Sequence, residues 1–303
     1  MRKFSNRIIG VLLTILVVAV ILDFAYTNIY ENSEPRTKFQ YLRSLENTKV
    51  NYIFLGSSRV DSGIVPSIIE TKTKKTTLNL GFEYSNFGDL YHLMKLLKEY
   101  NISSDSIFIQ VDYMYNKQIG HSNNLPYEMS PFIRDNPATK EYLVDYVGKN
   151  RSNYYFPFYR YCTQDAKIGF REVVANIFKK NRNIVQNKGY QPLQGIENQK
   201  DGHRSLPDSI AEKNIYFDKI KEYSKKNGIK VVFFCAPFCK HTAHLDYISK
   251  LKTKIPELYD FSKSIDDDKM FVNCYHLNDA GARKFTEIFT EKVLNNHMLL
   301  IPN

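Results

Sequence analysis

The chain contains no tryptophan and only four cysteines among its 303 residues. Four cysteines are too few for a disulfide-built scaffold of this length, and none stand at the C-x-x-C spacing of a zinc or redox motif. Disulfides stay open in an oxidising compartment, but the sequence assigns no pairing, and we expect Cys235 and Cys274 to pack as small apolar residues. His241 and His244 have the spacing of two metal ligands without a third nearby, so we predict no metal site and no cofactor.

Acidic residues are outnumbered, because 32 Asp and Glu stand against 42 Lys and Arg and give a formal net charge of +10. The excess of basic residues is spread along the chain rather than gathered in an arm. We therefore predict a solvated surface and no nucleic-acid binding. Apolar residues make up 43% of the chain and charged residues 24%, which excludes disorder throughout and predicts a packed core.

A long apolar run, Ile8–Leu22, follows Arg2, Lys3 and Arg7 and precedes Asp23. A helix needs about 20 residues to cross the hydrocarbon of a bilayer, and this stretch nearly suffices when Asp23 lies at the headgroups. Basic residues before the run place the N-terminus in the cytoplasm. We predict a single-pass signal anchor in the cell membrane with an extracytoplasmic body. The alternative is a cleaved signal peptide, although no clear cleavage site follows.

The predicted organisation has four parts. They are a basic cytoplasmic tail (1–7), a membrane-spanning helix (8–26), a polar stalk (27–48) and a single exported domain (49–303) with a large insertion at about 113–207. The insertion is rich in Tyr, Phe, Asn and Pro and contains one helical stretch, Gln164–Lys180. It is either a lid or substrate platform or a packing embellishment. His203, near its end, either lines the site or lies at the surface.

The exported part alternates short apolar runs with amphipathic segments. We predict strands at Tyr52–Leu55, Thr76–Leu80, Ser106–Val111 and Ile229–Cys235, a short fifth strand near Leu258–Phe261, and helices at Val65–Thr71, Asn86–Tyr100, Ser209–Lys226 and Asn278–Asn295. This alternation predicts a three-layer αβα fold around a mostly parallel, flavodoxin-like sheet. Functional groups in such folds lie beyond the carboxyl ends of the strands, which points to Gly56–Arg59, Gly81–Ser85, Asp112–Asn116 and the segment after Cys235.

A serine turn and a late histidine both fall at this predicted edge. The turn Gly56-Ser57-Ser58 lies where a strand meets a helix, so that a hydroxyl is presented beside free backbone N–H groups; such turns also bind phosphate or cap helices. His276 directly precedes the last helix and can face the strand ends. A serine nucleophile needs a base within hydrogen-bond reach, so the pair favours acyl transfer. Arg59 either binds an anionic or carbonyl group or forms a surface salt bridge.

These segments resemble the SGNH (GDSL-like) hydrolase superfamily over roughly residues 50–110 and 209–295. The G-x-S turn of that family is matched by Gly56-Ser57-Ser58, which implies Ser58 as the nucleophile. The glycine after its second strand is matched by Gly81, which implies an oxyanion or substrate-binding position. Its last block, D-x-x-H, is matched by Asn273 to His276, which implies His276 as the base and Asn273 as the group that orients it.

Two departures from the family pattern concern the site. Asn273 replaces the family's aspartate; an amide oxygen can hold the imidazole N–H but supplies no charge, and Asp279 is an alternative carboxylate. The G-x-N-D block is not recognisable, and Asp112 stands in its place as a candidate for oxyanion or substrate binding. Asn79 and Asn86 are alternative oxyanion donors because both are near Gly81 in the sequence.

The resemblance implies an exported serine esterase or O-acyltransferase that acts through a Ser58 acyl-enzyme. Its substrate would be a small acyl group, most simply acetyl, on a cell-envelope or extracellular polysaccharide. The implied partners are the membrane, the acylated glycan and a membrane-bound O-acyltransferase. Two alternatives stay open. The first, which Asn273 favours, is a non-catalytic accessory protein of an envelope glycan acylation system. The second is an unrelated envelope binding protein.

Overall fold

The computed structural model describes residues 2–148, 151–180, 182–196 and 205–295. The chain divides into two compact units, each assembled from two separate stretches. The first unit is Met1–Ser44 with Asn124–Arg182, and the second is Leu45–Asn123 with Asn183–Asn303. The insertion predicted at 113–207 is therefore divided between them, because its middle part belongs with the N-terminal helices and its two ends belong with the second unit.

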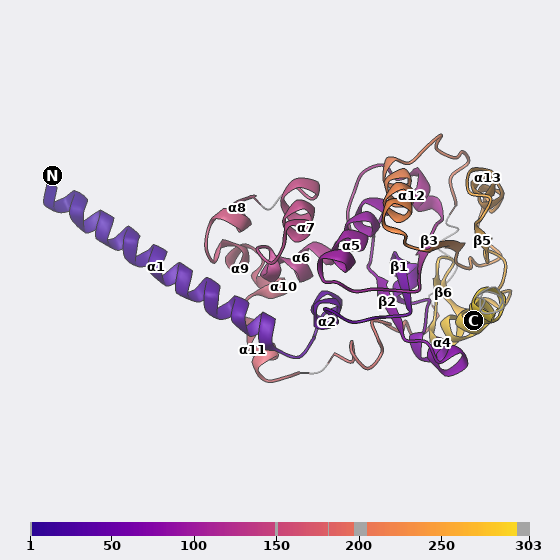
Figure 1. Ribbon diagram of the computed structural model, residues 1–303, viewed down its shortest axis with the longest axis horizontal. Helices are drawn as coiled ribbons and strands as arrows, with labels where there is room; N and C mark the ends of the chain where they lie inside the picture. The colour runs from indigo at the N-terminus through magenta and orange to yellow at the C-terminus, as the bar shows by residue number, and fades with distance from the viewer. Residues whose placement is uncertain (1, 149–150, 181, 197–204, 296–303) are drawn as a thin grey trace. The chain divides into compact units, whose positions relative to one another are not determined.

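A parallel sheet of five strands forms the centre of the second unit (Figure 1). The strands are β1 (Tyr52–Gly56), β2 (Thr77–Gly81), β3 (Ser106–Gln110), β4 (Val231–Cys235) and β5 (Tyr259–Asp260). They lie in the order β2-β1-β3-β4-β5, and every neighbouring pair is parallel. This is the flavodoxin-like order, so the predicted α/β fold class is confirmed. Strands β1, β2 and β3 are buried along their whole length, which is why they appear in the sequence as short, mostly apolar runs.

Helices cover both faces of this sheet. They are α3 (Ser58–Asp61), α4 (Pro66–Thr73), α5 (Phe87–Glu99), α12 (Ile215–Asn227), α13 (Asp246–Lys254) and α14 (Asp279–Phe289), the last continued by a π-helical turn at Thr290–Leu294. Successive side chains of a strand point to opposite faces. Phe54 of β1 packs against Phe289 of α14, with 5.4 Å between ring centroids, whereas Phe233 of β4 packs against Phe217 of α12 at 4.9 Å. The second unit thus has three layers.

Short elements complete the second unit at the carboxyl ends of the strands. They are two 3-10 turns, Tyr113–Asn116 and Asp268–Met270, and the antiparallel pair β6 (Phe271–Asn273) and β7 (His276–Leu277). One predicted helix begins later than expected, at Ile215 rather than Ser209. The reason is local, because the Asn214 side chain accepts hydrogen bonds from the N–H groups of Tyr216 and Phe217 and so caps the helix at that point.

In the residues that the structure describes, the first unit consists of helices and the turns that connect them. Its helices are α1 (Arg2–Asn32), α2 (Lys38–Ser44), α6 (Leu125–Met129), α7 (Pro137–Lys140), a π-helical stretch at Glu141–Tyr146, α8 (Arg151–Tyr155), α9 (Tyr159–Thr163), α10 (Asp165–Ile168) and α11 (Phe170–Ile177), with a 3-10 turn at Ser130–Phe132. Helix α1 is long and apolar enough to cross a membrane. The single helix predicted at Gln164–Lys180 is interrupted at Gly169, which separates α10 from α11.

The segment predicted as a polar stalk, 27–48, contains regular structure instead. Helix α1 continues to Asn32, and α2 follows after a short connection. Tyr30 and Phe39 are buried, and both rings contact Phe132, with centroid distances of 6.4 and 5.5 Å. These aromatic contacts join the segment to the middle of the insertion, and sequence periodicity alone does not reveal contacts over such a separation.

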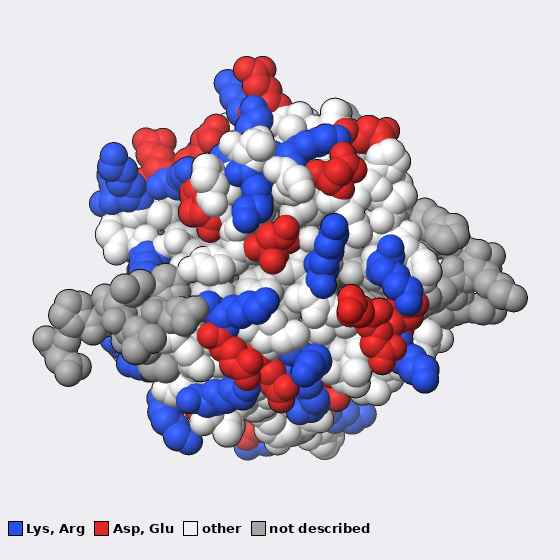
Figure 2. All heavy atoms as spheres, turned by 90° about the vertical axis from the view of Figure 1, so that its right-hand side faces the viewer, with Lys and Arg blue, Asp and Glu red and all other residues white. Residues whose placement is uncertain are grey.

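Charged side chains of both signs are interspersed over the face that Figure 2 draws. Lys and Arg alternate there with Asp and Glu, as the even distribution of basic residues along the sequence predicts. Opposite charges at such spacing form weak surface ion pairs, of which Lys221 with Glu257, at 3.4 Å, is an example. The absence of nucleic-acid binding stays a prediction.

Candidate active site

The turn after β1 is held by hydrogen bonds to the last residue of β3, Gln110. Ser57 is the N-cap of α3; its N–H and its Oγ–H both donate to Gln110 Oε1 at 2.9 Å. Gly56 is required at this point, because a Cβ atom there would lie 2.6 Å from Gln110 Oε1. The tight turn places Ser58 at the first position of α3, where its N–H has no acceptor within the helix.

Ser58 and His276 meet although 218 residues separate them in the sequence. The distance from Ser58 Oγ to His276 Nε2 is 2.8 Å. On the other side of the ring, His276 Nδ1 lies 3.0 Å from Asn273 Oδ1. The same amide oxygen accepts the backbone N–H groups of Tyr275 and His276, each at 3.1 Å. The three predicted catalytic residues therefore lie in one hydrogen-bonded row.

The tautomer of His276 follows from these contacts. The atom of Asn273 that accepts two backbone N–H groups must be oxygen, since the amide nitrogen is a donor and would oppose them. An oxygen only accepts, so the proton of the neutral ring sits on Nδ1 and Nε2 carries the lone pair. His276 can thus accept the proton of Ser58, which is the role of a general base.

Asp279, the alternative carboxylate, is committed to other partners. Its Oδ1 accepts the hydroxyl of Tyr190 at 2.8 Å, and its Oδ2 accepts Arg283 Nε at 2.9 Å. Burial opposes ionisation of Asp279, but the hydrogen bonds from Arg283 and Tyr190 outweigh it and hold its pKa below the ordinary value. Burial, reinforced by the Asp279 carboxylate, raises the pKa of Tyr190. Asp279 therefore serves the first turn of α14, where a negative charge is favourable.

The sequence left two alternatives for Arg59, a group that binds an anion or a carbonyl oxygen and a surface salt bridge, and the structure shows a third arrangement. Arg59 is neither a surface ion pair nor open to a substrate, since only 3% of its surface is exposed. Its Nη1 lies 2.9 Å from Asp112 Oδ2, and its Nη2 donates to the carbonyl oxygens of Ala236 and Pro237 at 2.8 and 2.6 Å. The guanidinium also lies over the Phe238 ring, 3.5 Å from its centroid. One residue along a helix turns the side chain by about 100°, so the neighbour of Ser58 points into the protein.

Asp112 has buried hydrogen-bond partners and is also among the residues that line the cavity over Ser58, so its substrate-binding role stays a prediction. Its carboxylate is buried and accepts Arg59 Nη1, Gln110 Nε2 and the N–H of Met114, the last at 3.0 Å. It therefore joins Arg59 to the residue that supports the Ser57 turn. We name Gln110, Asp112 and Arg59 the buried polar network.

Gly81 fills a close-packing position, and its N–H is already used. A Cβ atom there would lie 2.2 Å from the Asp61 backbone nitrogen, and the Gly81 N–H donates to Asn79 Oδ1 at 3.0 Å. The other proposed donors are also committed. The Asn79 amide donates to backbone carbonyls of the chain around α3, and the Asn86 amide nitrogen donates to the Gly120 carbonyl. The backbone N–H of Ser58 itself is the donor that this turn offers to an oxyanion.

A cavity of about 370 Å³ lies over Ser58 and His276. Side chains that the sequence motifs did not single out line it, namely Tyr84, Tyr113, Lys117 and Gln191. Tyr84 and Tyr113 follow β2 and β3, so the strand-end rule pointed to their segments without choosing the residues. Gln191 comes from the turn Lys188–Leu193 at the returning end of the insertion, a turn whose composition predicts a support for the site rather than a chemical role.

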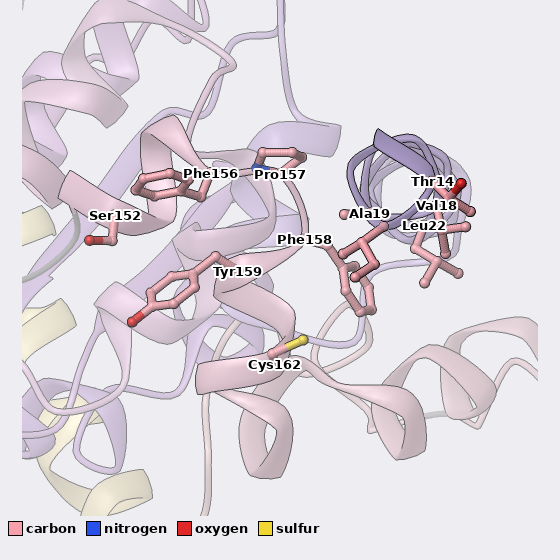
Figure 3. A pocket seen from close by; sticks show the side chains of 11 residues that line it. Thr14, Val18, Ala19, Leu22, Ser152, Phe156, Pro157, Phe158, Tyr159 and Cys162 are labelled. Carbon is pink, nitrogen blue, oxygen red and sulfur yellow. The ribbon is translucent and has the colours of Figure 1, made fainter. Parts of the chain in front are cut away.

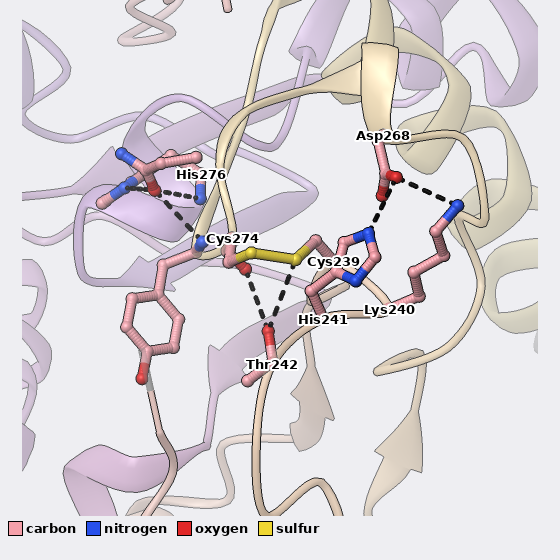
Figure 4. Close-up of a disulfide and its surroundings, with 9 residues drawn as sticks. Cys239, Lys240, His241, Thr242, Asp268, Cys274 and His276 are labelled. Atoms are coloured by element: carbon pink, nitrogen blue, oxygen red, sulfur yellow. Dashed lines mark hydrogen bonds and ion pairs between the residues drawn. A yellow bond between two sulfur atoms is a disulfide. The ribbon is translucent and has the colours of Figure 1, made fainter. Parts of the chain in front are cut away.

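A disulfide joins Cys239 to Cys274 close to His276 (Figure 4). Cys274 packs in the apolar core, as predicted, and the structure adds the pairing that the sequence left unassigned. Cys235 is buried and free, and burial raises the pKa of its thiol. The bond links the segment after β4 to the loop that carries Asn273 and His276, and the Cys239 N–H donates to the Cys274 carbonyl at 3.1 Å. It therefore restrains the loop that carries the histidine.

Removing this disulfide should cost stability. The Cys239→Ser, Cys274→Ser variant opens a loop of 35 residues, and we expect a loss of about 2–4 kcal/mol in the free energy of unfolding in urea. Cys162→Ser is the matched control, since that thiol is free and exposed, and it should change stability by less than about 0.5 kcal/mol. Four titratable thiols in the unreduced, denatured wild type would contradict the pairing.

Candidate metal ligands do not gather in the part of the chain that the structure describes. No group of three or more His, Cys, Asp or Glu side chains placed to hold a metal ion occurs there. His241 and His244 instead contact Asp268 and Asp208, at 3.1 and 2.5 Å, on the exposed surface. His203 lies outside the described residues.

The candidate site therefore rests on its geometry. A hydroxyl within hydrogen-bond distance of one imidazole nitrogen, with the second ring nitrogen held by an oxygen, is the arrangement that activates a serine nucleophile. The cavity leaves room for a small acyl group and part of its carrier. No family model matches this chain, and no curated protein matches it in sequence.

Proposed function

We propose that the second unit is a serine esterase or O-acyltransferase of the SGNH-like type. The observation that carries the proposal is the 2.8 Å contact between Ser58 Oγ and His276 Nε2, with Nδ1 held by Asn273. In the first step the Ser58 proton passes to Nε2 and Oγ bonds to the acyl carbonyl carbon. The tetrahedral intermediate then expels its alkoxide, which takes the proton from His276 and leaves an acyl-serine. Water or a sugar hydroxyl, deprotonated by His276, releases the acyl group.

The acyl group we propose is acetyl, carried on a cell-envelope or extracellular polysaccharide. Exposed aromatic rings and polar side chains suit a carbohydrate, because sugars present C–H faces to rings and hydroxyls to hydrogen-bonding groups. Tyr84 and Lys117 offer both kinds of contact in the cavity wall. Tyr84 also adopts a left-handed backbone conformation with φ of 59°, which is unusual for a bulky residue and common at binding sites.

We further propose that the protein is a single-pass membrane protein with a cytoplasmic N-terminus and an extracytoplasmic catalytic unit. Arg2, Lys3 and Arg7 before the apolar run support this orientation. The disulfide supports it as well, since disulfides persist mainly in oxidising compartments. The proposed partners are an acylated glycan and a membrane-bound O-acyltransferase, which would supply or receive the acyl group.

Replacing Asn273 with aspartate tests the mechanism at the position that departs from the family. The carboxylate can accept the same three N–H groups and adds a negative charge beside the imidazolium that forms during catalysis. We expect hydrolysis of p-nitrophenyl acetate to rise by at least about tenfold, which corresponds to about 1.4 kcal/mol of transition-state stabilisation. In a His276→Ala background the gain should vanish, because the charge acts only through the ring.

A second function, a non-catalytic accessory in glycan acylation, is favoured by one observation. His276 is held by an uncharged amide, and the carboxylate of Asp279 is occupied by Tyr190 and Arg283. Under this alternative neither the wild type nor Asn273→Asp turns over an acetyl ester, and acetylated polysaccharide still binds to the cavity. Acetate release by the wild type that is absent in His276→Ala would exclude it.

A further inference from the structure

A large apolar groove lies in the first unit, between α1 and the segment that carries α8 and α9 (Figure 3). Its volume is about 750 Å³. One wall is formed by Thr14, Ile15, Val18, Ala19 and Leu22 of α1. The other wall comes from residues 152–162, which contribute the rings of Phe156, Phe158 and Tyr159. The Phe158 ring lies beside α1 in Figure 3.

Residues 152–162 are joined to α1 by ion pairs around the buried side chain of Asp23. Asp23, only 7% exposed, lies 2.7 Å from Arg160 Nη2 and 2.6 Å from Arg134 Nη1. Arg160 also donates to Thr27 Oγ1 at 2.7 Å. A carboxylate at the end of an apolar run is costly to bury unless it is paired, and two guanidinium groups from the insertion pair it. The segment after α8 is thus held at one fixed height along α1.

The segment held there has an unusual composition. Every residue of Tyr154–Tyr159 is aromatic or proline. Tyr155 and Phe156 are 66% and 61% exposed, although Phe158 packs its ring against Tyr26 with 5.0 Å between centroids. A cluster of large exposed aromatic side chains is unfavourable in water and marks a surface that is covered by something else. Tyrosine and phenylalanine are the residues that soluble surfaces avoid and membrane interfaces favour.

The position of the groove along α1 indicates which molecules surround it, because the groove lies beside the apolar run of that helix. From Leu22 to Thr14 the helix rises about 12 Å, and both residues belong to the apolar run that begins at Ile8. When α1 crosses a bilayer, its wall of the groove lies within the hydrocarbon, and Asp23 with its two arginines marks the boundary. Water does not fill an apolar groove at that depth, whereas a hydrocarbon chain does.

We propose that residues 152–162 enter the bilayer beside α1 and that the groove between them holds an acyl chain of a membrane lipid. In the proposed orientation this is the outer leaflet. The inference rests on the membrane-spanning part of the proposed function and is independent of the chemistry of Ser58. It makes the middle of the insertion a second membrane contact that fixes the unit around α1 against the lipid surface.

The absence of tryptophan from the chain makes a sharp test available. Single-tryptophan variants of the full chain, Phe156→Trp and Val17→Trp, are reconstituted at low protein density in phosphatidylcholine vesicles whose acyl chains carry bromine. Phe156 is exposed, so the substitution leaves the packing of the unit intact. We expect bromine to quench Phe156→Trp at least about half as strongly as Val17→Trp, since both would lie among the chains. Aqueous iodide should quench neither, with N-acetyltryptophanamide as the reference for full access.

Each other outcome overturns the proposal in a distinguishable way. Quenching of Phe156→Trp by iodide but not by brominated lipid, with Val17→Trp quenched by lipid, would place the aromatic segment in water. Protection of Phe156→Trp from both quenchers would mean that a second copy of the chain covers the groove. Failure of lipid to quench Val17→Trp would show that α1 does not lie in the bilayer, and would remove the membrane part of the proposed function without touching the esterase.

Discussion

Replacing Ser58 with alanine should abolish labelling by a fluorophosphonate and lower acetyl-ester turnover by about 10⁶-fold. The size of the loss follows from serine hydrolases, where removal of the nucleophile eliminates the covalent route and leaves only binding and oxyanion contacts. Ser58 Oγ lies 2.8 Å from His276 Nε2, so the two side chains are already within hydrogen-bond distance for transfer of the hydroxyl proton. The measurement is in-gel fluorescence of the labelled protein beside a steady-state rate.

Ser57→Ala is the matched control because the two serines are adjacent and differ only in direction. Ser57 Oγ donates to Gln110 and accepts the N–H of Arg59, so it supports the turn. Loss of this cap should cost about 1 kcal/mol of stability and leave labelling at Ser58 intact. Labelling that survives in Ser58→Ala would show that Ser58 is not the nucleophile. Labelling that disappears only in Ser57→Ala would assign that role to Ser57, and either result would contradict the proposed site.

Asp112→Asn should lower the free energy of unfolding by about 3–5 kcal/mol, because it leaves the Arg59 guanidinium buried without a counter-charge. Both side chains of this pair are 1% exposed. Oδ2 of Asp112 accepts from Arg59 and from Gln110, and an amide nitrogen at that position would confront two donors instead. The unfolding midpoint in urea, followed by circular dichroism, measures the loss.

An exposed ion pair provides the comparison. Glu257→Gln removes the partner of Lys221, and both side chains there are about half exposed, at 50% and 48%. We expect that variant to change stability by less than about 1 kcal/mol, since water screens such a pair. Equal losses in the two variants would show that the Arg59–Asp112 pair is not buried as described. Because Gln110 holds the Ser57 turn, Asp112→Asn should also slow turnover.

The sequence by itself determined the strands of the sheet and placed Ser58, His276 and Asn273 as candidates for one site. The runs at β1, β3 and β4 are short and mostly apolar because the strands are covered on both faces, and this is a local signal that survives in any context. Gly56 and the serine turn follow β1 directly, and His276 precedes a helix, so the strand-end rule placed both at one edge.

What the tertiary structure alone decided depends on side chains that are distant in sequence. The role of Arg59 depended on whether its side chain met water or Asp112, and residue type does not distinguish a substrate ligand from a buried partner. The pairing of Cys239 with Cys274 required the loop after β4 to lie beside the histidine loop. From the sequence, Asp279 is a plausible carboxylate partner for His276. In the structure its carboxylate instead accepts a hydrogen bond from Tyr190, which lies at the end of the insertion.

The same reason explains the first unit. The apolar run predicted α1, since length and composition suffice for a membrane-spanning helix. The sequence does not predict that Arg134 and Arg160 pair with Asp23, because these ion pairs join residues more than a hundred positions apart. Periodicity records which face of a segment is covered, whereas the identity of the covering residues is fixed only when hydrophobic burial brings the separate segments together.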